Sequence, residues 1–237
     1  MKCQLNHLIS KLIQLKDYFV LKRRLRRLAP GDFLITPLPH YYSQHTKTNW
    51  RERGERWKSK QECEYWEART CAIGCLQMVI STKCKPPSIA ALTQKGLDLR
   101  GYNTETDAGW FHHPLVKLAK QFGLDGKVLR YLSIPKIIYE LSKGRFIIAS
   151  VNSIKLDQLL KDIKRPARTN VDHMVLLVGY HLNNKSAGFY LMNPSYPNPR
   201  GPNQPFFIKP KSFLHVFNHR GISLYPCYKQ CPKTAPL

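Results

Sequence analysis

The sequence lacks any apolar stretch of the roughly 18 residues that a membrane-spanning helix requires, so we expect no transmembrane segment. The first 20 residues do not resemble a secretion signal, because lysine, glutamine and aspartate residues interrupt their apolar positions. A disulfide framework is missing as well, since the seven cysteines are odd in number and irregularly spaced. These absences together predict a cytoplasmic protein with free thiols.

Acidic residues are scarce: 15 aspartates and glutamates stand against 38 lysines and arginines, for a formal net charge of +23. Such an excess attracts polyanions, so we expect weak electrostatic binding to nucleic acid or to an anionic membrane. The basic residues are spread along the chain, which weakens the case for a dedicated nucleic-acid arm. The oligomeric state is not specified by any pattern in the sequence.

The chain contains no internal repeat, and its 237 residues are enough for one good-sized core. Residues 5–28 combine an apolar stripe at helical spacing with the basic run KRRLRR at 22–27, and Pro30-Gly31 ends this helix. Such a helix either lies on an anionic surface or packs on the domain with a solvated charged end. We therefore predict an N-terminal extension over residues 1–31, one domain over 32–226 and a flexible tail over 227–237.

Hydrophobic periodicity predicts an α+β fold in which helices mostly precede strands. The expected helices cover residues 70–80, 88–97, 114–122, 133–142 and 211–216, with Ser88 as the cap of the second. The expected strands cover residues 128–131, 146–151, 173–180, 188–193, 204–208 and 221–225, after an extended edge segment at 33–43. Residues 45–66, which contain three tryptophans, read as a surface loop or flap, and residues 156–170 as an exposed insertion.

The stretch TCAIGCLQMVI at residues 70–80 organises the rest of the chain. Its apolar residues recur at helical spacing, and the Thr70 hydroxyl can cap the first turn. Cys71 would then lie where unpaired amides and the helix dipole favour a negative charge, which lowers a thiol pKa and produces a nucleophilic thiolate. Glycine is unfavourable inside a helix, so Gly74 indicates that something approaches the helix backbone closely there.

A predicted hairpin brings two further polar residues together. If residues 180–181 and 187–188 close the hairpin, Val175 faces Asn193, and His173 shares the face of Val175 because side chains alternate along a strand. His173 and Asn193 would then be diagonal neighbours within hydrogen-bond reach. A histidine held by an amide oxygen is suited to take the proton of a thiol.

Four separated segments resemble motifs of papain-like cysteine peptidases, and among these the bacteriocin-processing (double-glycine leader) peptidases and their stand-alone relatives. The segments are LPHYYSQ (38–44), CAIGCLQMVI (71–80), DHMVLLVGY (172–180) and FYLMNP (189–194), and GWFHHPL (109–115) also resembles the stand-alone members. They occur in the family's order and cover roughly residues 36–225. Three differences stand out: Ala72 and Asn193 replace the usual Gly and Asp, and a long insertion separates Gln44 from Cys71.

The resemblance implies a papain-like α+β fold and a cysteine peptidase that hydrolyses a peptide or isopeptide bond without a metal or other cofactor. Matched position by position, it implies that Cys71 is the nucleophile, His173 the general base and Asn193 its orienting partner. Gln44 would stabilise the oxyanion together with the Cys71 amide. Small side chains near the scissile bond are expected on the same ground.

Other functions remain open at this point. The same triad could serve an acyltransferase or a deamidase, which an amine acceptor would reveal by forming an adduct. A basic nucleic-acid-binding protein on a degenerate peptidase fold would instead show steep salt dependence of binding. A metal site is a further alternative, although the spacings among Cys63, Cys71, Cys75 and Cys84 match no zinc pattern.

Overall fold

The computed structural model of the chain describes residues 23, 28–45, 57–107, 109–159, 172–183, 187–198 and 200–227. Its strands are β1 (Gly31–Leu34), β2 (Leu124–Leu129), β3 (Phe146–Asn152), β4 (Asp172–Leu182), β5 (Ala187–Met192), β6 (Phe206–Ile208) and β7 (Phe217–Pro226). Its helices are α2 (Lys60–Glu67), α3 (Cys71–Ser81), α4 (Ile89–Asp98), α5 (His112–Lys120), α6 (Ile134–Ser142), α7 (Ser153–Leu159) and α8 (Pro210–Val216).

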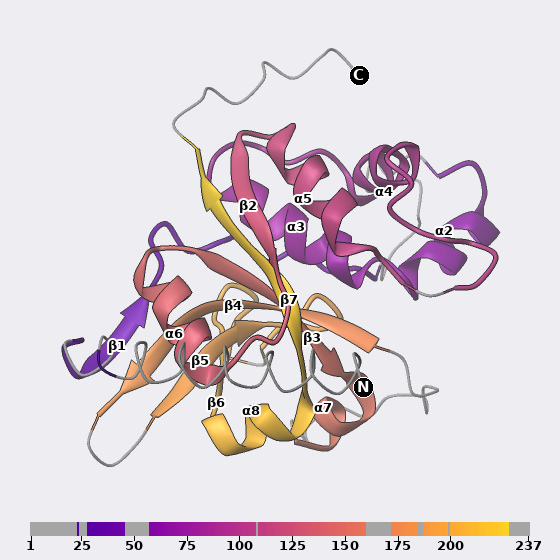
Figure 1. Cartoon of the computed structure of the whole chain (residues 1–237). Helices are drawn as coiled ribbons and strands as arrows, with labels where there is room; N and C mark the ends of the chain where they lie inside the picture. Colours follow the sequence, from indigo (N-terminus) through magenta and orange to yellow (C-terminus); the bar gives the residue numbers. More distant parts are fainter. Residues whose placement is uncertain are drawn as a thin grey trace, which may run out of the picture.

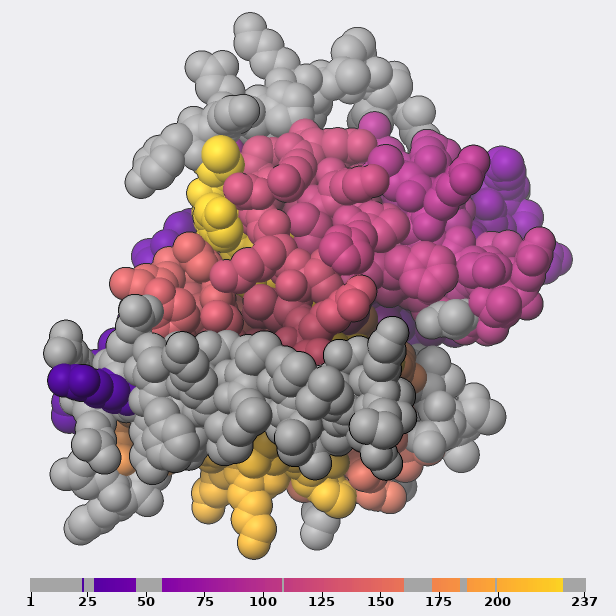
Figure 2. All heavy atoms as spheres, in the orientation of Figure 1, coloured from indigo at the N-terminus to yellow at the C-terminus, as the bar shows by residue number. Residues whose placement is uncertain are grey.

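The described strands form one antiparallel sheet in the order β2-β7-β3-β4-β5-β6, and β1 pairs with the second half of β4. Helices α2 to α5 gather on one side of the molecule, whereas α6, α7 and α8 lie with the body of the sheet (Figure 1). The predicted α+β class is therefore confirmed. In the space-filling view, α4, α5 and β2 form a continuous upper mass in magenta and pink (Figure 2).

Helix α3 is the most deeply buried of the described helices. Nine of its eleven residues, Ala72 to Ile80, are buried, and a helix that is apolar on all sides belongs in a core. Gly74 has the close neighbour that its position predicted: an added Cβ would lie 3.0 Å from Pro194 Cβ and 3.9 Å from Gln44 Cβ. The start of α3 thus packs directly against the segments that carry Gln44 and Asn193.

Helices α4, α5 and α6 confirm the sequence periodicity with shifts of one or two residues. The Ser88 hydroxyl accepts from the Ala91 amide at 3.2 Å and caps α4 as predicted. Pro135 lies in the first turn of α6, where its missing N–H has no helical partner to lose. The predicted strand at 128–131 was misplaced, because β2 spans Leu124–Leu129 and pairs with β7.

The interpretation of residues 45–66 as a surface loop was wrong for the part that the structure describes. Helix α2 occupies Lys60–Glu67, and the Ser59 hydroxyl caps it by accepting from the Glu62 amide at 3.1 Å. Its Trp66 side chain is buried and packs edge-on against Tyr102. Residues 46–56 lie outside the described residues. Likewise, the expected exposed insertion begins in helix α7, and residues 160–170 lie outside.

The β4–β5 hairpin contains a register shift that the sequence did not predict. Near the turn Tyr180 pairs with Phe189, whereas beyond an irregularity between Leu177 and Gly179 the partner of Leu176 is Met192. Gly179 is required there, because a Cβ would lie 2.2 Å from the Phe33 carbonyl oxygen of β1. The last pair, Leu176 with Met192, is in the register that the sequence predicted.

The predicted division of the chain at residues 31 and 226 stays a prediction, since most of residues 1–31 and all of 228–237 lie outside the described part. No helix among the described residues is long and apolar enough to cross a membrane. Cys63, Cys71, Cys75 and Cys227 form no disulfide, but Cys84 is disulfide-bonded. The expectation that the thiols are all free was therefore wrong.

Candidate active site

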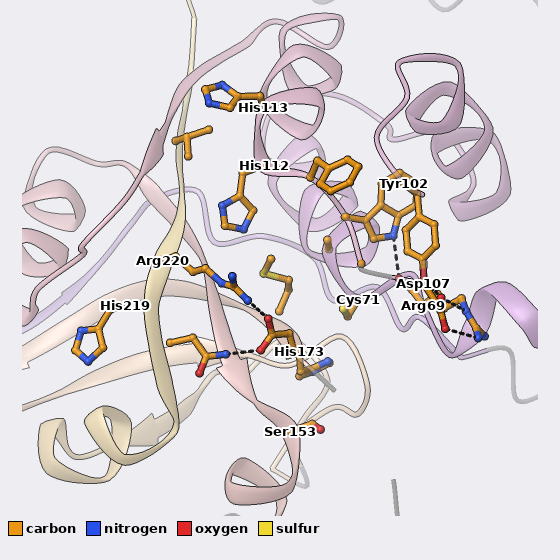
Figure 3. A pocket seen from close by; sticks show the side chains of 18 of the residues that line it. Arg69, Cys71, Tyr102, Asp107, His112, His113, Ser153, His173, His219 and Arg220 are labelled. Carbon is orange, nitrogen blue, oxygen red and sulfur yellow. Dashed lines mark hydrogen bonds and ion pairs between the residues drawn. The ribbon is translucent and has the colours of Figure 1, made fainter. Parts of the chain in front are cut away.

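A cleft of about 1190 Å³ lies between the helical side of the molecule and the sheet. One wall comes from residues 68–72 at the start of α3 and from the 102–113 segment. The other wall comes from the ends of β2, β4 and β7. Cys71 and His173 both line this cleft, from opposite walls (Figure 3).

Cys71 is the first residue of α3 and is partly exposed in the cleft. The predicted Thr70 cap is wrong, because the Thr70 hydroxyl is buried and makes no hydrogen bond with the described residues. In the first hydrogen bond of the helix, the Gly74 amide donates to the Thr70 carbonyl oxygen at 2.8 Å. The amides of residues 71–73 therefore precede the helical ladder, and they point toward the end where the dipole favours an anion.

Cys75, one turn further along α3, is in a different environment. It is fully buried, and its thiol donates to the Met174 carbonyl oxygen at 3.5 Å. Burial raises the pKa of the Cys75 thiol well above its ordinary value, and the neighbouring Cys71 adds to that rise. Cys75 thus ties α3 to β4 beside His173 and remains a neutral thiol.

His173 and Asn193 are brought together as the hairpin register predicted. The side chains are buried, and His173 Nε2 lies 2.8 Å from Asn193 Oδ1. An amide oxygen can only accept, so Nε2 carries the hydrogen and Nδ1 of the neutral ring is the nitrogen that can take a proton. The Ser195 amide donates to the same Oδ1 at 3.0 Å, which fixes the orientation of the Asn193 amide.

Gln44 is buried behind the first turn of α3 and is not among the residues that line the cleft. Its backbone amide donates to the Pro194 carbonyl at 2.8 Å, and its Oε1 accepts from the Ser195 hydroxyl at 3.0 Å. Its Nε2 donates one hydrogen to the Glu67 carbonyl at 2.8 Å. Because an amide nitrogen has two hydrogens, this arrangement holds the side chain fixed and leaves one donor for a further acceptor.

Ser195 is a residue that sequence reasoning missed. Its amide holds Asn193 and its hydroxyl holds Gln44, so one residue connects the histidine side of the site with the predicted oxyanion side. The only signal in the sequence was its position two residues after Asn193. Short-range patterns do not show that Gln44, more than a hundred residues earlier, lies next to it.

The approach to Cys71 is framed by a second network that the sequence did not predict. The Arg69 guanidinium donates two hydrogen bonds to the Asp107 carboxylate, at 2.9 and 2.8 Å. The Tyr102 hydroxyl donates a third to the same carboxylate. The Trp110 indole donates to the Arg69 carbonyl at 2.9 Å. The bond to Arg69 lowers the pKa of Asp107, so this carboxylate stays charged and keeps the 102–110 segment against the residues that precede Cys71.

Among the described residues, the cysteines do not gather into a metal site. The described residues contain no cluster of three or more histidine, cysteine, aspartate or glutamate side chains that could hold an ion. Cys63 is buried on α2, where its thiol lies 3.9 Å from Glu67 Oε1. The four cysteines weighed as zinc ligands therefore form no such cluster in the part of the chain that the structure describes.

The fold and the cleft together are those of a papain-like cysteine peptidase. The chain belongs to the Peptidase_C39 like family, whose model matches residues 40–217 and so spans all four predicted site residues. A solved structure of a putative C39-like peptidase from Bacillus anthracis is similar over 84% of this chain and 100% of its own, with 14% identity and a TM-score of 0.53.

Two further structures are similar at lower scores. The peptidase domain of Streptococcus ComA, a bi-functional ABC transporter, matches 67% of this chain and 93% of its own, with 17% identity and a TM-score of 0.43. A double glycine motif protease from an AMS/PCAT transporter, in complex with its leader peptide, matches 65% and 81%, with 20% identity and a TM-score of 0.36. No curated protein sequence matches this chain.

Proposed function

We propose that this cysteine peptidase hydrolyses a peptide bond through a Cys71-His173-Asn193 triad. The observation that carries the proposal is the 2.8 Å contact between His173 Nε2 and Asn193 Oδ1, in the wall that faces Cys71 across the cleft. This contact fixes the tautomer in which Nδ1 accepts a proton. Cys71 at the first turn of α3 is the matching thiol, because the helix start stabilises its anion.

In the first half of the reaction, His173 Nδ1 takes the Cys71 proton and the thiolate attacks the carbonyl carbon of the scissile peptide bond. The tetrahedral oxyanion collapses, and the imidazolium gives its proton to the leaving amine, which leaves a thioester on Cys71. In the second half His173 takes a proton from water, the hydroxide attacks the thioester, and the carboxylic acid and the Cys71 thiol are released. Asn193 keeps the imidazole ring oriented throughout.

A thiol-directed peptidase probe tests this proposal directly. A peptidyl vinyl sulfone ending in glycine should modify Cys71, because it requires a thiolate in a cleft that accepts a peptide. Cys63 and Cys75 should remain unmodified, because both are buried. Peptide mapping by mass spectrometry identifies the labelled residue, and labelling of any other cysteine in preference to Cys71 would contradict the assignment.

Gln44 is proposed to stabilise the oxyanion with its remaining Nε2 hydrogen. Replacing Gln44 by Ala should lower kcat by about 100-fold or more, the usual cost of losing such a donor. Alkylation of Cys71 by iodoacetamide should persist, because that reaction passes through no oxyanion. Steady-state hydrolysis and the alkylation rate provide the two readouts.

A matched variant, Ser195→Ala, removes the hydrogen bond to Gln44 Oε1 but keeps the Gln44 amide nitrogen. Its loss of kcat should be smaller than that of Gln44→Ala. If Gln44→Ala also abolishes alkylation, or if the two variants lose the same activity, Gln44 acts as a structural residue and the oxyanion role is wrong.

Binding to polyanions and a cytoplasmic location stay predictions from the sequence. At the Cys71 end of the cleft, the described residues nevertheless favour a peptide substrate over a nucleic acid. Its Cys71 end contains the Arg69–Asp107 pair, in which the carboxylate already neutralises the guanidinium.

A further inference from the structure

One end of the cleft, away from the Arg69–Asp107 pair, collects positive charge. Strand β2 pairs with β7 up to Leu129 opposite Gly221, so the next two residues, Arg130 and Arg220, follow at the same sheet end. Both line the cleft and both are exposed. Like charges held close together at one end of a sheet repel each other, so this juxtaposition is not explained by folding alone.

Three histidines line the same end of the cleft: His112 and His113 at the start of α5, and His219 beside Arg220. In Figure 3 the His112 ring lies between His113 and Arg220. Burial lowers the pKa of His112, and the charges of Arg220, His113 and Arg130 lower it further. Arg220, His113 and Arg130 are therefore close enough to His112 to disfavour a positive charge on its ring. Helix α5 also has no acidic residue in its first turn.

The backbone holds this arrangement in an unfavourable conformation. Tyr131, which follows Arg130, and His219, which precedes Arg220, both have positive φ angles, of 54° and 55°. Residues other than glycine adopt such angles at a cost, and they concentrate at functional sites. The Leu132 amide donates to the His219 carbonyl at 2.8 Å, which connects the two loops that carry the arginines.

An irregularity in β7 directs the same residues into the cleft. The pairing with β3 shifts between Ala149 and Val151, whose partners are Gly221 and Phe217, so residues 218–220 bulge opposite Ser150. Asp172 is the one carboxylate at this end among the described lining residues, and Arg220 and Asn218 both bind it. Arg130 forms no ion pair with any described residue, so its charge is not compensated within this part of the chain.

We propose that this end of the cleft, where Arg130 and Arg220 supply the positive charge and the neutral His112 ring supplies a hydrogen bond, binds a carboxylate of the peptide substrate. The inference rests on the proposed peptidase function and adds a substrate class to it: peptides with an acidic group a short distance from the scissile bond. The carboxylate can come from an acidic side chain or from the free end of the chain. It pairs with the Arg130 guanidinium, whose charge no described residue compensates, and it gains charge-assisted hydrogen bonds from a preformed site.

Alkylation of Cys71 by matched bromoacetyl peptides tests the inference without requiring turnover. The probes are bromoacetyl-glycyl-glutamate amide, its glutamine amide counterpart, and bromoacetyl-glycyl-glutamine with a free terminal carboxylate, each with a spacer of one to three glycines. Mass spectrometry of the full chain, with peptide mapping, gives the second-order rate constant at Cys71. We expect a carboxylate probe to react about fivefold faster than the neutral one at its best spacer, as one partly exposed ion pair allows.

The variants distinguish a local site from the general charge of the protein. Arg130→Gln should bring the carboxylate-to-neutral ratio to about one, whereas Arg130→Lys should keep most of it. Lys211→Gln is the control, because it removes the same charge from an exposed residue that does not line the cleft, and it should leave the ratio unchanged. Faster reaction of the glutamate amide identifies a side-chain carboxylate as the ligand, and faster reaction of the free-ended probe a chain terminus.

A carboxylate-to-neutral rate ratio of about one in the wild-type protein at every spacer length would overturn the inference. So would an Arg130→Gln variant that keeps the wild-type ratio. Failure of the peptidase assignment gives a different result. If the peptidase assignment is wrong, peptides are not hydrolysed even though the carboxylate-to-neutral ratio of Cys71 alkylation falls in Arg130→Gln. If peptides are hydrolysed but the alkylation shows no carboxylate preference, only the carboxylate-binding inference is wrong.

Discussion

Replacing Cys71 by Ser should abolish hydrolysis and probe labelling, with a loss of at least about a thousandfold in kcat. A serine hydroxyl is a much weaker nucleophile than a thiolate, and the helix start at residue 71 is suited to stabilising a thiolate. Because Cys71 is partly exposed and the change is small, the free energy of unfolding should change by no more than about 1 kcal/mol. Turnover and the urea midpoint of the same preparation measure both effects.

Cys75→Ser is the matched control, since it makes the same chemical change one helical turn away. It should retain activity, because the Cys75 thiol is buried and its raised pKa keeps it protonated. The new hydroxyl has the Met174 carbonyl as an acceptor, but its shorter bond to Cβ moves it away from the 3.5 Å contact. We expect a stability loss of about 1–2 kcal/mol. A dead Cys75→Ser protein or a fully active Cys71→Ser protein would show that the nucleophile has been wrongly assigned.

The sequence predicted the site best where the signal was local or repeated. The apolar spacing of residues 71–80 predicted a buried helix, and α3 has nine buried residues out of eleven. The close approach at Gly74 was also predicted correctly, because a glycine that interrupts a strong helical pattern lowers helix stability and so indicates a packing requirement at that position. The prediction that Thr70 caps α3 was wrong. Capping depends on the backbone torsions of the cap residue and on the direction of its hydroxyl, and a threonine favours the required geometry without imposing it.

The pairing of His173 with Asn193 was correct for a reason that the sequence did not show. Near the turn Tyr180 is opposite Phe189, and if that register continued, Asn193 would lie opposite Leu176. Leu176 and His173 are on opposite faces of β4, so Asn193 would then lie on the wrong face to contact His173. The irregularity between Leu177 and Gly179 restores the predicted face. It occurs where β1 crosses, since the Phe33 carbonyl leaves no room for a side chain at Gly179. A long-range contact therefore decided a local register.

The cationic end of the cleft lay beyond sequence reasoning for the same physical reason. Arg130 and Arg220 become neighbours only through the pairing of β2 with β7, across about ninety residues of chain. The link from Gln44 through Ser195 to Asn193 also depends on long-range packing. In a chain with 38 lysines and arginines, no single one of them stands out until the sheet order is known.

Replacing Asn193 by Ala should lower kcat/KM by about a hundredfold, because His173 would lose the acceptor that fixes its tautomer and ring orientation. Part of the effect is structural, since the Ser195 amide would lose the same acceptor. We expect about 1–3 kcal/mol of lost stability from these unpaired donors. The measurement is therefore a pH–rate profile of kcat/KM, combined with the urea midpoint.

Asn193→Asp separates the orienting role from the structural one. An aspartate keeps both acceptor contacts, so activity should be largely retained, and its negative charge stabilises the imidazolium form of His173. Proton transfer from Cys71 gives a thiolate–imidazolium pair, and stabilising the imidazolium raises the pKa of His173 in that pair. The upper limb of the pH profile, where the imidazolium loses its proton, should therefore move to higher pH. The burial of both side chains strengthens this coupling, because the surroundings screen it less than water does. If the upper limb stays in place in Asn193→Asp, or if Asn193→Ala keeps full activity, Asn193 does not orient the base and the triad assignment fails at this residue.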